Sequence, residues 1–428
     1  MKLRSPALLF SVLCFTAATG VVLFAAIGSS RASQAATAPA ERKLGPLVDA
    51  EVAPSRARLL DIAFEAAALL PENPHIRNRE RNRGEVVEAC LAIDLPVRAH
   101  EFAQGMTTWR QGNAFAALAC YAARRGAEAE TERLIELART SAEEAARKND
   151  EAGKSQGWQR DRIFVRIAEA YELLGKGAKA ERFTSSASTE EKSKLIGLHA
   201  ERADAAGFEA LIAELDGVLA TTTFEQVESS LRACTELYGR FYADAEKRAA
   251  IEARFTSSWK HVPLQVRIEL TLGLAHVAAE ASDATNALRF VDEARATFDG
   301  VLWEPQDYVA IGAGIAAARH RAGATAAARA ELDAFAARYV VERDSIVDIY
   351  RAKAVRALAE AYGVVGEAGL RAEHYARAVE EGNVNPNGRP RVDDLVATCC
   401  SMVRTGFVVD EKLLARIEAV KAGLKAPW

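Results

Sequence analysis

The chain contains 428 residues, of which 50% are hydrophobic but only 7% aromatic, and its formal net charge is −4. Alanine and small aliphatic residues therefore supply most of the core, which suits closely packed helices. The slight excess of negative charge gives no general attraction for a phosphate backbone and disfavours nucleic acid as the main partner. No proline lies between Pro96 and Pro263. Because an interior proline costs a helix about 3 kcal/mol, this span favours helix, and we predict an all-α fold.

The amino terminus has the features of an export segment. Lys2 and Arg4 precede an apolar run of 22 residues, 7–28, which at about 1.5 Å per residue is long enough to cross a hydrocarbon core of roughly 30 Å. That length favours a membrane anchor, whereas the small residues at 33–38 resemble a signal-peptidase site and favour a cleaved signal. We expect residues 1–35 to be a signal peptide or an anchor. The body would then be exported, in a periplasmic or other extracytoplasmic location.

The body is predicted to begin after a short tether. Residues 31–54 mix Ala, Ser, Thr and Pro without periodicity and are typical of a tether, and we assign residues 36–54 to a flexible linker. Pro54 and Ser55 form a plausible start for the first helix, and Pro71 and Pro74 end it. We therefore assign residues 55–428 to one helical body. The apolar face of its first helix contains Leu59, Ile62, Ala63 and Ala66.

The densest basic cluster of the chain follows this helix. It contains Arg77, Arg79, Arg81 and Arg83, offset only by two glutamates. One hypothesis is a site for phosphate or an acidic polymer. The alternative, which we favour, is a solvated helix start whose arginines pair with neighbouring carboxylates, because a few exposed arginines are ordinary surface.

A turn residue recurs behind each predicted helix, at intervals of 32 to 49 residues. Since glycine can take the left-handed conformation that ends a helix, these positions predict turns within helical hairpins. Similar units at such intervals are typical of an α-solenoid, here of about eight or nine hairpins. The turn residues are Gly126, Gly175, Gly207, Gly323, Gly366 and Gly406, with Gly239 and Ser282 filling the long gap.

Aligning the chain on these turns shows two recurring positions. Trp109 and Trp158 each lie 17 residues before a turn glycine, and Trp259 has a comparable place. We expect them to pack at the start of the first helix of a hairpin, as core aromatics rather than as exposed stacking groups for a ligand. A small residue also lies seven positions before five of the glycines, where it would let neighbouring helices approach closely. These residues are Ala119, Ala168, Ala316, Ala359 and Cys399.

The clearest predicted hairpin covers residues 162–187. Its apolar residues fall at offsets that share one face of a helix, and their spacing resembles the unit of the tetratricopeptide repeat family, a helix-turn-helix of 34 residues. Residues 354–378 repeat the pattern and residues 315–332 repeat it more weakly. The resemblance implies a right-handed α-solenoid of TPR-like repeats, although longer periods and missing prolines make them degenerate. The matching residues are Phe164, Ile167, Ala168, Tyr171, Gly175, Ala180 and Ala187.

The sequence offers no catalytic, cofactor-binding or metal motif. The seven histidines lie far apart, and no P-loop, GxGxxG, GxSxG, HExxH or CxxC occurs. Four cysteines lie five to seven positions before a turn residue, where other units have alanine, so we predict small buried hydrophobes. Disulfides between Cys90 and Cys120, or within the adjacent pair Cys399 and Cys400, are the alternative in an exported chain. We expect no enzyme activity and no cofactor.

The resemblance also implies a function. TPR-like arrays generally bind peptides or protein surfaces in the groove lined by the first helix of each pair, so we expect a non-enzymatic scaffold or adaptor with a protein or peptide partner. Arg162 and Arg166, one turn apart, would hold a carboxylate there, or would be surface charge balanced by Glu169. The implied groove residues are Arg162, Arg166, Glu169 and Glu172 in one unit and Lys353, Arg356 and Glu360 in another.

Two other functions remain open at this stage. The chain could be a helical subunit or recognition domain of a cell-envelope enzyme complex, although the repeats leave no room for a separate catalytic domain. It could also be a structural envelope protein that associates with itself. Crosslinking distinguishes this last alternative, since a structural protein would give links only to its own copies.

Overall fold

The computed structural model describes residues 47–428 except 152, 154–155 and 221–222. Within these residues every regular element is a helix, which confirms the all-α prediction. No helix of the described part is long and apolar enough to span a bilayer. The predicted signal or anchor, residues 36–46 of the predicted linker and Cys14 lie outside the described residues.

The helices follow one another mainly as pairs joined by short turns. The first half of the chain contains α1 (Pro54–Leu69), α2 (Glu72–Ala92), α3 (Pro96–Gln104), α4 (Trp109–Arg124), α5 (Glu128–Glu151), α6 (Gly157–Leu173), α7 (Gly177–Thr184), α8 (Thr189–Lys192), the 3₁₀ helix η1 (Ser193–Leu195), α9 (Ile196–Arg202) and α10 (Phe208–Leu219). The second half contains α11 (Phe224–Arg240), α12 (Ala245–Ser258), η2 (Trp259–His261), α13 (Leu264–Glu280), α14 (Ala284–Asp299), α15 (Pro305–Arg321), α16 (Thr325–Glu342), η3 (Arg343–Ser345), α17 (Asp348–Val365), α18 (Ala368–Gly382), α19 (Gly388–Arg404) and α20 (Glu411–Ala422).

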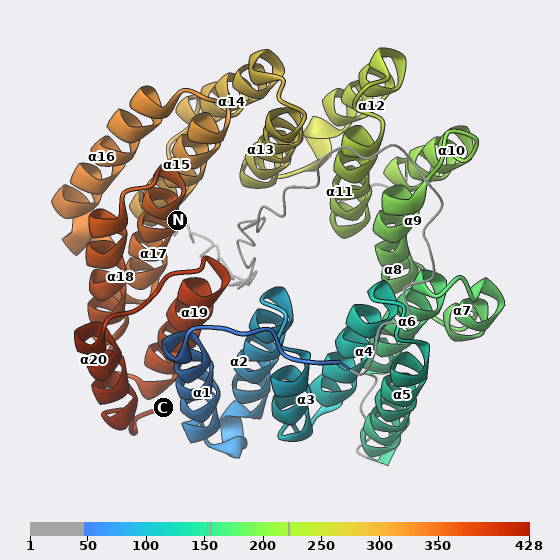
Figure 1. Cartoon of the computed structure of the whole chain (residues 1–428), viewed down its shortest axis with the longest axis horizontal. Coiled ribbons are helices and arrows are strands. Elements are labelled where there is room, and N and C mark those ends of the chain that lie inside the picture. The colour runs from blue at the N-terminus through green and yellow to red at the C-terminus, as the bar shows by residue number, and fades with distance from the viewer. Residues whose placement is uncertain (1–46, 152, 154–155, 221–222) are drawn as a thin grey trace, which may run out of the picture.

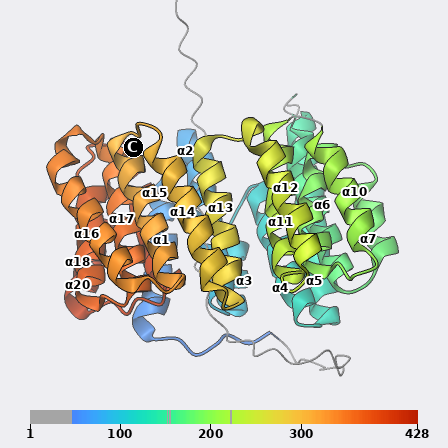
Figure 2. The same cartoon turned by 90° about the horizontal axis from the view of Figure 1, so that it is seen from above.

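The pairs are arranged in a ring (Figure 1). The first helix of most pairs lies in an inner layer with α2 and α9, and the second helix lies outside it. Figure 2 shows the helices standing side by side, so that the ring is about one helix tall. Most inner helices pack directly on the inner helices beside them, and α6 is connected to α9 through α8 and η1. The predicted α-solenoid architecture is thereby confirmed.

The two ends of the array pack against each other, which closes the ring. Helix α1 lies against α19 and α20, and α2 also contacts α19. One hydrophobic core continues across this contact, which we call the seam; it includes Leu59, Ile62, Val392 and Val396, all fully buried. The polar contacts of the seam include Arg56 Nη2 donating to Val403 O (2.6 Å), Asn82 Nδ2 donating to Asp393 Oδ1 (2.8 Å), and the ion pair of Arg404 with Glu85 (3.6 Å).

Seven helix ends use the same turn. In each, a residue with positive φ follows the helix, and the next backbone N–H donates to the carbonyl five residues earlier at 2.8 to 3.1 Å. This bond defines the Schellman motif. Asp94, which the sequence analysis missed, takes this place without glycine, because aspartate tolerates the left-handed region better than most residues. The other six are predicted turn residues: Gly126, Gly175, Ser282, Gly323, Gly366 and Gly406.

Two predicted turns are wrong. Gly207 has a φ of −80° and precedes α10 as its N-cap, and Gly239 lies inside α11. The turn after α11 depends instead on Asp244, whose carboxylate accepts hydrogen bonds from two backbone N–H groups at the start of α12. Gly239 faces Val277 of α13, where a Cβ would lie 3.5 Å from the valine side chain. Its role is close packing rather than a turn.

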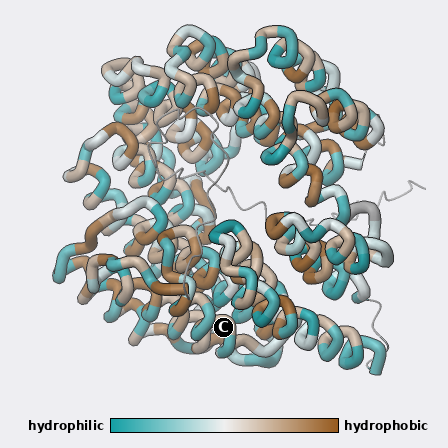
Figure 3. Tube along the Cα trace, turned by 45° about the vertical axis from the view of Figure 1, so that its right-hand side comes forward, coloured by the Kyte–Doolittle hydropathy of each residue, from teal (hydrophilic) through white to brown (hydrophobic). Residues whose placement is uncertain are grey.

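The core lies between the two layers. The five small residues that precede the turns are fully buried, as predicted. In Figure 3, hydrophobic and hydrophilic stretches alternate along the helices, as expected for helices with one buried side. The first helix begins at Pro54, slightly before the predicted start after Ser55, and Pro74 lies inside α2 at a kink instead of ending α1.

A tyrosine four residues before its turn glycine ties successive hairpins together. Tyr171 of α6 donates its hydroxyl to Glu132 of α5 at 2.8 Å, and Tyr362 of α17 donates to Asp333 of α16 at 2.8 Å. Burial raises the pKa of Glu132, but hydrogen bonds from Lys176, Lys179 and Tyr171 outweigh it and lower the pKa to about 2. The carboxylate therefore stays ionised, and the link persists at any ordinary pH.

Candidate functional site

The predicted groove residues of α6 lie on the ring but are engaged with neighbouring helices. Arg162 forms an ion pair with the buried Glu191 of α8 at 2.9 Å. Arg166 reaches Glu88 of α2 at 3.8 Å, and its Nη1 is buried without a hydrogen-bond partner in the described part of the chain. Glu169 lies 3.5 Å from Arg124 of α4, and Glu172 contacts His199 of α9 at 3.1 Å. These charges join adjacent units.

The predicted residues of α17 are similarly engaged. Lys353 lies 4.0 Å from Asp307 of α15. Arg356 donates to the hydroxyl of Thr398 at 3.3 Å, and Glu360 accepts a hydrogen bond from Ser401 at 2.5 Å, both on α19. Burial raises the pKa of Glu360, against the opposing effects of the Ser401 hydrogen bond and the Arg356 charge. The structure therefore places the predicted residues in two separate networks, one around α6 and one around α17, rather than in one site.

The cysteines follow the interpretation as small buried residues. Within the described residues Cys90, Cys120, Cys234, Cys399 and Cys400 are all free and buried. Burial raises the pKa of the Cys234 and Cys399 thiols to about 12. The Cys120 thiol donates to the Arg166 carbonyl at 3.3 Å. Neither of the alternative disulfides forms, and the described residues contain no group of three or more side chains that could hold a metal ion.

The basic cluster of α2 is divided among different roles. Arg83 is buried, pairs with the fully buried Glu80 at 3.0 Å and donates to the Gly105 carbonyl at 2.8 Å. Arg79 and Arg81 pair with Glu72 (3.6 Å) and Asp393 (3.1 Å). The favoured interpretation, pairing with carboxylates, thus fits three of the four arginines. Arg77 is exposed and has no ion pair among the described residues.

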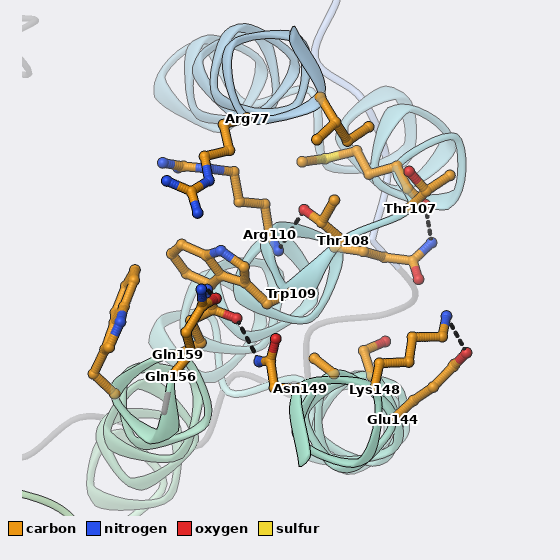
Figure 4. Close-up of a pocket in the computed structure, with 16 residues that line it drawn as sticks. Arg77, Thr107, Thr108, Trp109, Arg110, Glu144, Lys148, Asn149, Gln156 and Gln159 are labelled. Carbon is orange, nitrogen blue, oxygen red and sulfur yellow. Dashed lines mark hydrogen bonds and ion pairs between the residues drawn. The ribbon is translucent and has the colours of Figure 1, made fainter. Parts of the chain in front are cut away.

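Arg77 borders a pocket with a volume of about 810 Å³, within the range of ordinary ligand sites. The pocket is formed by the beginning of α2, the loop before α4, the beginnings of α4 and α6, and the end of α5 (Figure 4). The Glu80 carboxylate fixes the loop by accepting a hydrogen bond from the backbone N–H of Thr107 at 3.0 Å. The pocket wall therefore depends on the buried Glu80–Arg83 pair.

Two tryptophans form one side of the pocket. The rings of Trp109 and Trp158 meet edge to face, with centroids 5.1 Å apart and an interplanar angle of 75°. Each lies at the start of a first helix, as predicted. Trp158 is nevertheless 44% exposed, so its interpretation as a core aromatic is wrong. Trp259 lies in η2 beyond the pocket, partly buried against Phe255 at 5.4 Å.

Guanidinium groups cover part of both rings. Arg110 lies 4.9 Å from the centroid of Trp109, and Arg162 lies 5.1 Å from that of Trp158. Burial lowers the pKa of Arg110, and the charges of Arg81 and Arg162 lower it further. The pocket thus combines positive charge, aromatic edges and amide side chains, a composition suited to binding an anion that has an apolar neighbour.

Sequence reasoning missed this pocket because its residues come from segments up to 83 positions apart. One signal was present: the common 17-residue offset of Trp109 and Trp158 places both at the same point of successive units, hence side by side once α4 and α6 pack. The amides of Asn149, Gln156 and Gln159 carried no such pattern. They are connected by hydrogen bonds of 3.1 and 2.5 Å.

No protein-family model and no curated protein matches the chain. One solved structure, described as a circular tandem repeat protein with novel repeat topology and enhanced subunit contact surfaces, aligns with 86% of this chain and 94% of its own. The sequence identity is 13% and the TM-score is 0.22, too low to support an inference about this chain. The hairpins themselves define the class: the chain is an all-α helical-repeat protein.

Proposed function

We propose that this protein is a non-enzymatic interaction scaffold, built from TPR-like units, that binds a protein or peptide partner. One observation carries the proposal. Because the ring is closed, the inner helices form a continuous inner layer on which charged side chains of different units lie next to each other. Arg166 and Glu88, only 3.8 Å apart and partly exposed, illustrate such a pair that a partner could contact.

We further propose that the scaffold is exported, either anchored by residues 7–28 or released after signal cleavage. The support is the apolar run with its basic flank in the sequence. Protease accessibility in intact cells and spheroplasts, together with the mature amino-terminal residue, tests this. Degradation in spheroplasts only would support a periplasmic location, and protection in both would contradict it.

The interaction proposal is tested by purifying the tagged protein from its native envelope, with crosslinking and mass spectrometry. We expect reproducible crosslinks from the inner helices to a second protein. The amount of that protein recovered with the Arg162→Glu, Arg166→Glu double variant should be at least tenfold lower than with the wild type. Arg338→Glu, on the outer helix α16, is the matched control. Because Arg162 also holds Glu191, melting curves must show that the double variant is folded.

Three results would contradict parts of this proposal. An unchanged set of partners in the double variant would remove these arginines from the binding surface. Links only between copies of this chain would favour the structural envelope protein instead. Recovery of a stable complex with an enzyme, through the same inner helices, would favour the recognition subunit of an envelope enzyme.

A further inference from the structure

Arg77 of α2 and Arg110 of α4 both line the pocket, and in Figure 4 their side chains point toward the same region of it. The guanidinium of Arg110 lies over the ring of Trp109, 4.9 Å from its centroid. Within the described residues, neither guanidinium has a carboxylate within ion-pair distance. Most of the arginines around them are paired, including Arg81 with Asp393 and Arg162 with Glu191. Two guanidinium groups that point at one place repel each other unless an anion lies between them. The pair therefore has the charge and arrangement to receive a carboxylate.

Burial at Arg110 strengthens this argument. Its side chain is half-buried against Trp109. Burial and the nearby charges of Arg81 and Arg162 lower its pKa, and the more weakly acting carboxylates of Glu88 and Glu80 oppose this. A cation that is partly removed from water and surrounded by other cations is destabilised, and an incoming anion relieves both effects. The remaining charges in the pocket, Lys148 and Glu144, pair with each other at 2.6 Å. Positive charge in the pocket is thus in excess.

The remaining surface favours a peptide as the carrier of that anion. Guanidinium groups cover one face of each tryptophan, so neither ring presents both faces to stack on a sugar. The exposed part of Trp158 suits an apolar side chain instead. The amides of Gln156 and Asn149 can hydrogen-bond a peptide backbone. The chain's net charge of −4 already disfavours a nucleic acid.

We propose that this pocket binds an acidic peptide segment, with a carboxylate between Arg77 and Arg110 and a neighbouring apolar side chain against Trp158. The inference rests on the proposed function as an interaction scaffold and names the chemistry of one class of partner. It concerns residues different from the inner wall. A pocket of about 810 Å³ accommodates a short segment rather than a folded domain.

The test uses fluorescein-labelled hexapeptides of alternating Glu and Leu, with Lys-Leu and Gln-Leu hexapeptides as matched probes. Anisotropy should show the Glu-Leu peptide binding at least tenfold tighter than the other two. Raising the salt concentration should weaken that binding, because the contacts are charged and partly exposed. Bound peptide should also change the intrinsic tryptophan fluorescence, and Trp158→Ala should remove most of that change.

Substitutions identify the residues responsible. Arg77→Gln and Arg110→Gln should each weaken the Glu-Leu peptide about tenfold, and the double variant about a hundredfold. Arg77→Gln breaks no ion pair of the described chain, so it removes charge without disturbing the fold. Arg338→Gln, on the far side of the ring, should leave binding unchanged. Equal binding of all three peptides, or full binding by the double variant, overturns the proposal.

Two further outcomes are decisive. If N-acetylglutamate amide binds as tightly as the hexapeptide, the ligand is a small free acid and the peptide assignment is overturned. Suppose that the Arg77→Gln, Arg110→Gln variant binds every peptide as tightly as the wild type and still recovers every partner from the native envelope. The pocket proposal then fails and the scaffold stands. Absence of any partner with the wild-type protein, despite tight peptide binding, contradicts the scaffold alone.

Discussion

Gly312 illustrates how a neighbouring helix determines which residue a single position accepts. It lies in the middle of α15, where glycine is intrinsically unfavourable by about 1 kcal/mol relative to alanine. A Cβ at this position would lie 2.3 Å from two atoms of the Phe335 ring on α16, and that ring is only 3% exposed. Gly314, two residues later, has no atom of the described chain within 4 Å of its Cβ position. Glycine is therefore required by packing at position 312, whereas at position 314 of the same helix it is not.

We expect Gly312→Ala to lower the free energy of unfolding by about 1–3 kcal/mol, because the buried ring cannot move away from the new methyl group. Gly314→Ala is the matched control and should raise it by about 0.5–1 kcal/mol through helix propensity alone. Urea unfolding followed by circular dichroism measures both. Equal stabilisation by the two substitutions would mean that α15 and α16 are not packed as closely as the structure indicates.

Asp394 on α19 gives the protein a predictable response to pH. Burial, reinforced by the charges of Asp393 and Asp348, raises the pKa of its carboxyl to about 7, although Arg356 opposes the shift. An aspartate in the unfolded chain has a pKa of about 3.9. The folded protein therefore holds a proton that the unfolded chain has lost, so stability should fall as the pH rises from about 4 to about 7 and then level off.

Asp394→Asn should remove this dependence, because asparagine resembles the neutral acid. We expect the variant to melt several degrees above the wild type at pH 8 and close to it at pH 5. Differential scanning fluorimetry over that range measures the difference. Asp344→Asn, at a side chain that is 93% exposed, is the control. A gain that is constant with pH would show that the carboxyl is not buried in its neutral form.

At the scale of elements, the shared Schellman turn explains why hairpins could be recognised from sequence. Its left-handed residue is a local requirement that glycine meets at five places and that Asp94 and Ser282 meet less comfortably. The tyrosine link then joins one hairpin to the preceding one through residues about 30 to 40 positions apart. Regularity fails between Gly175 and Ser282, where short helices and an aspartate cap replace this turn.

Serine and glycine can be exchanged between two equivalent turns, those at Ser282 and Gly366. Ser282 has a φ of +61°, so Ser282→Gly should raise the melting temperature, with a gain of about 1 kcal/mol. Gly366→Ser should lower stability by a similar amount, and purely for conformational reasons, because no described atom lies within 4 Å of its Cβ position. Thermal melts of both variants check this. Changes of the same sign in both would contradict a common turn geometry.

At the scale of the whole molecule, closure of the ring is the main feature. In an open solenoid the terminal units expose one face each, whereas here α1 and α19 cover each other through a continuous apolar core. Contacts across the seam join residues as much as 360 positions apart, such as Arg58 and Glu418. We therefore expect the stability of the folded ring to be nearly independent of where in the array the two chain termini lie.

Circular permutation tests this. A chain that begins at Leu302, a fully exposed residue between α14 and α15, with residues 428 and 47 joined by about 15–20 glycines and serines, should fold with a melting temperature within a few degrees of the wild type. The same permutant with Val396→Asp in the buried seam should not fold. Failure of the first permutant, with the unpermuted chain folded, would mean that the array is open.

The helical hairpins could be predicted from the amino-acid sequence, because amphipathic spacing and the left-handed turn act over a few residues. Small buried residues such as Ala168 and Ala359 were predictable for the same reason. Closure of the array could not be predicted in this way, since it depends on small rotations added over every unit. The pocket could not be predicted either, because the proximity of Arg77, Arg110 and Trp158 follows from how separate helices pack. Interactions between residues close in sequence determine each hairpin, and the packing of successive hairpins determines the ring and its pocket.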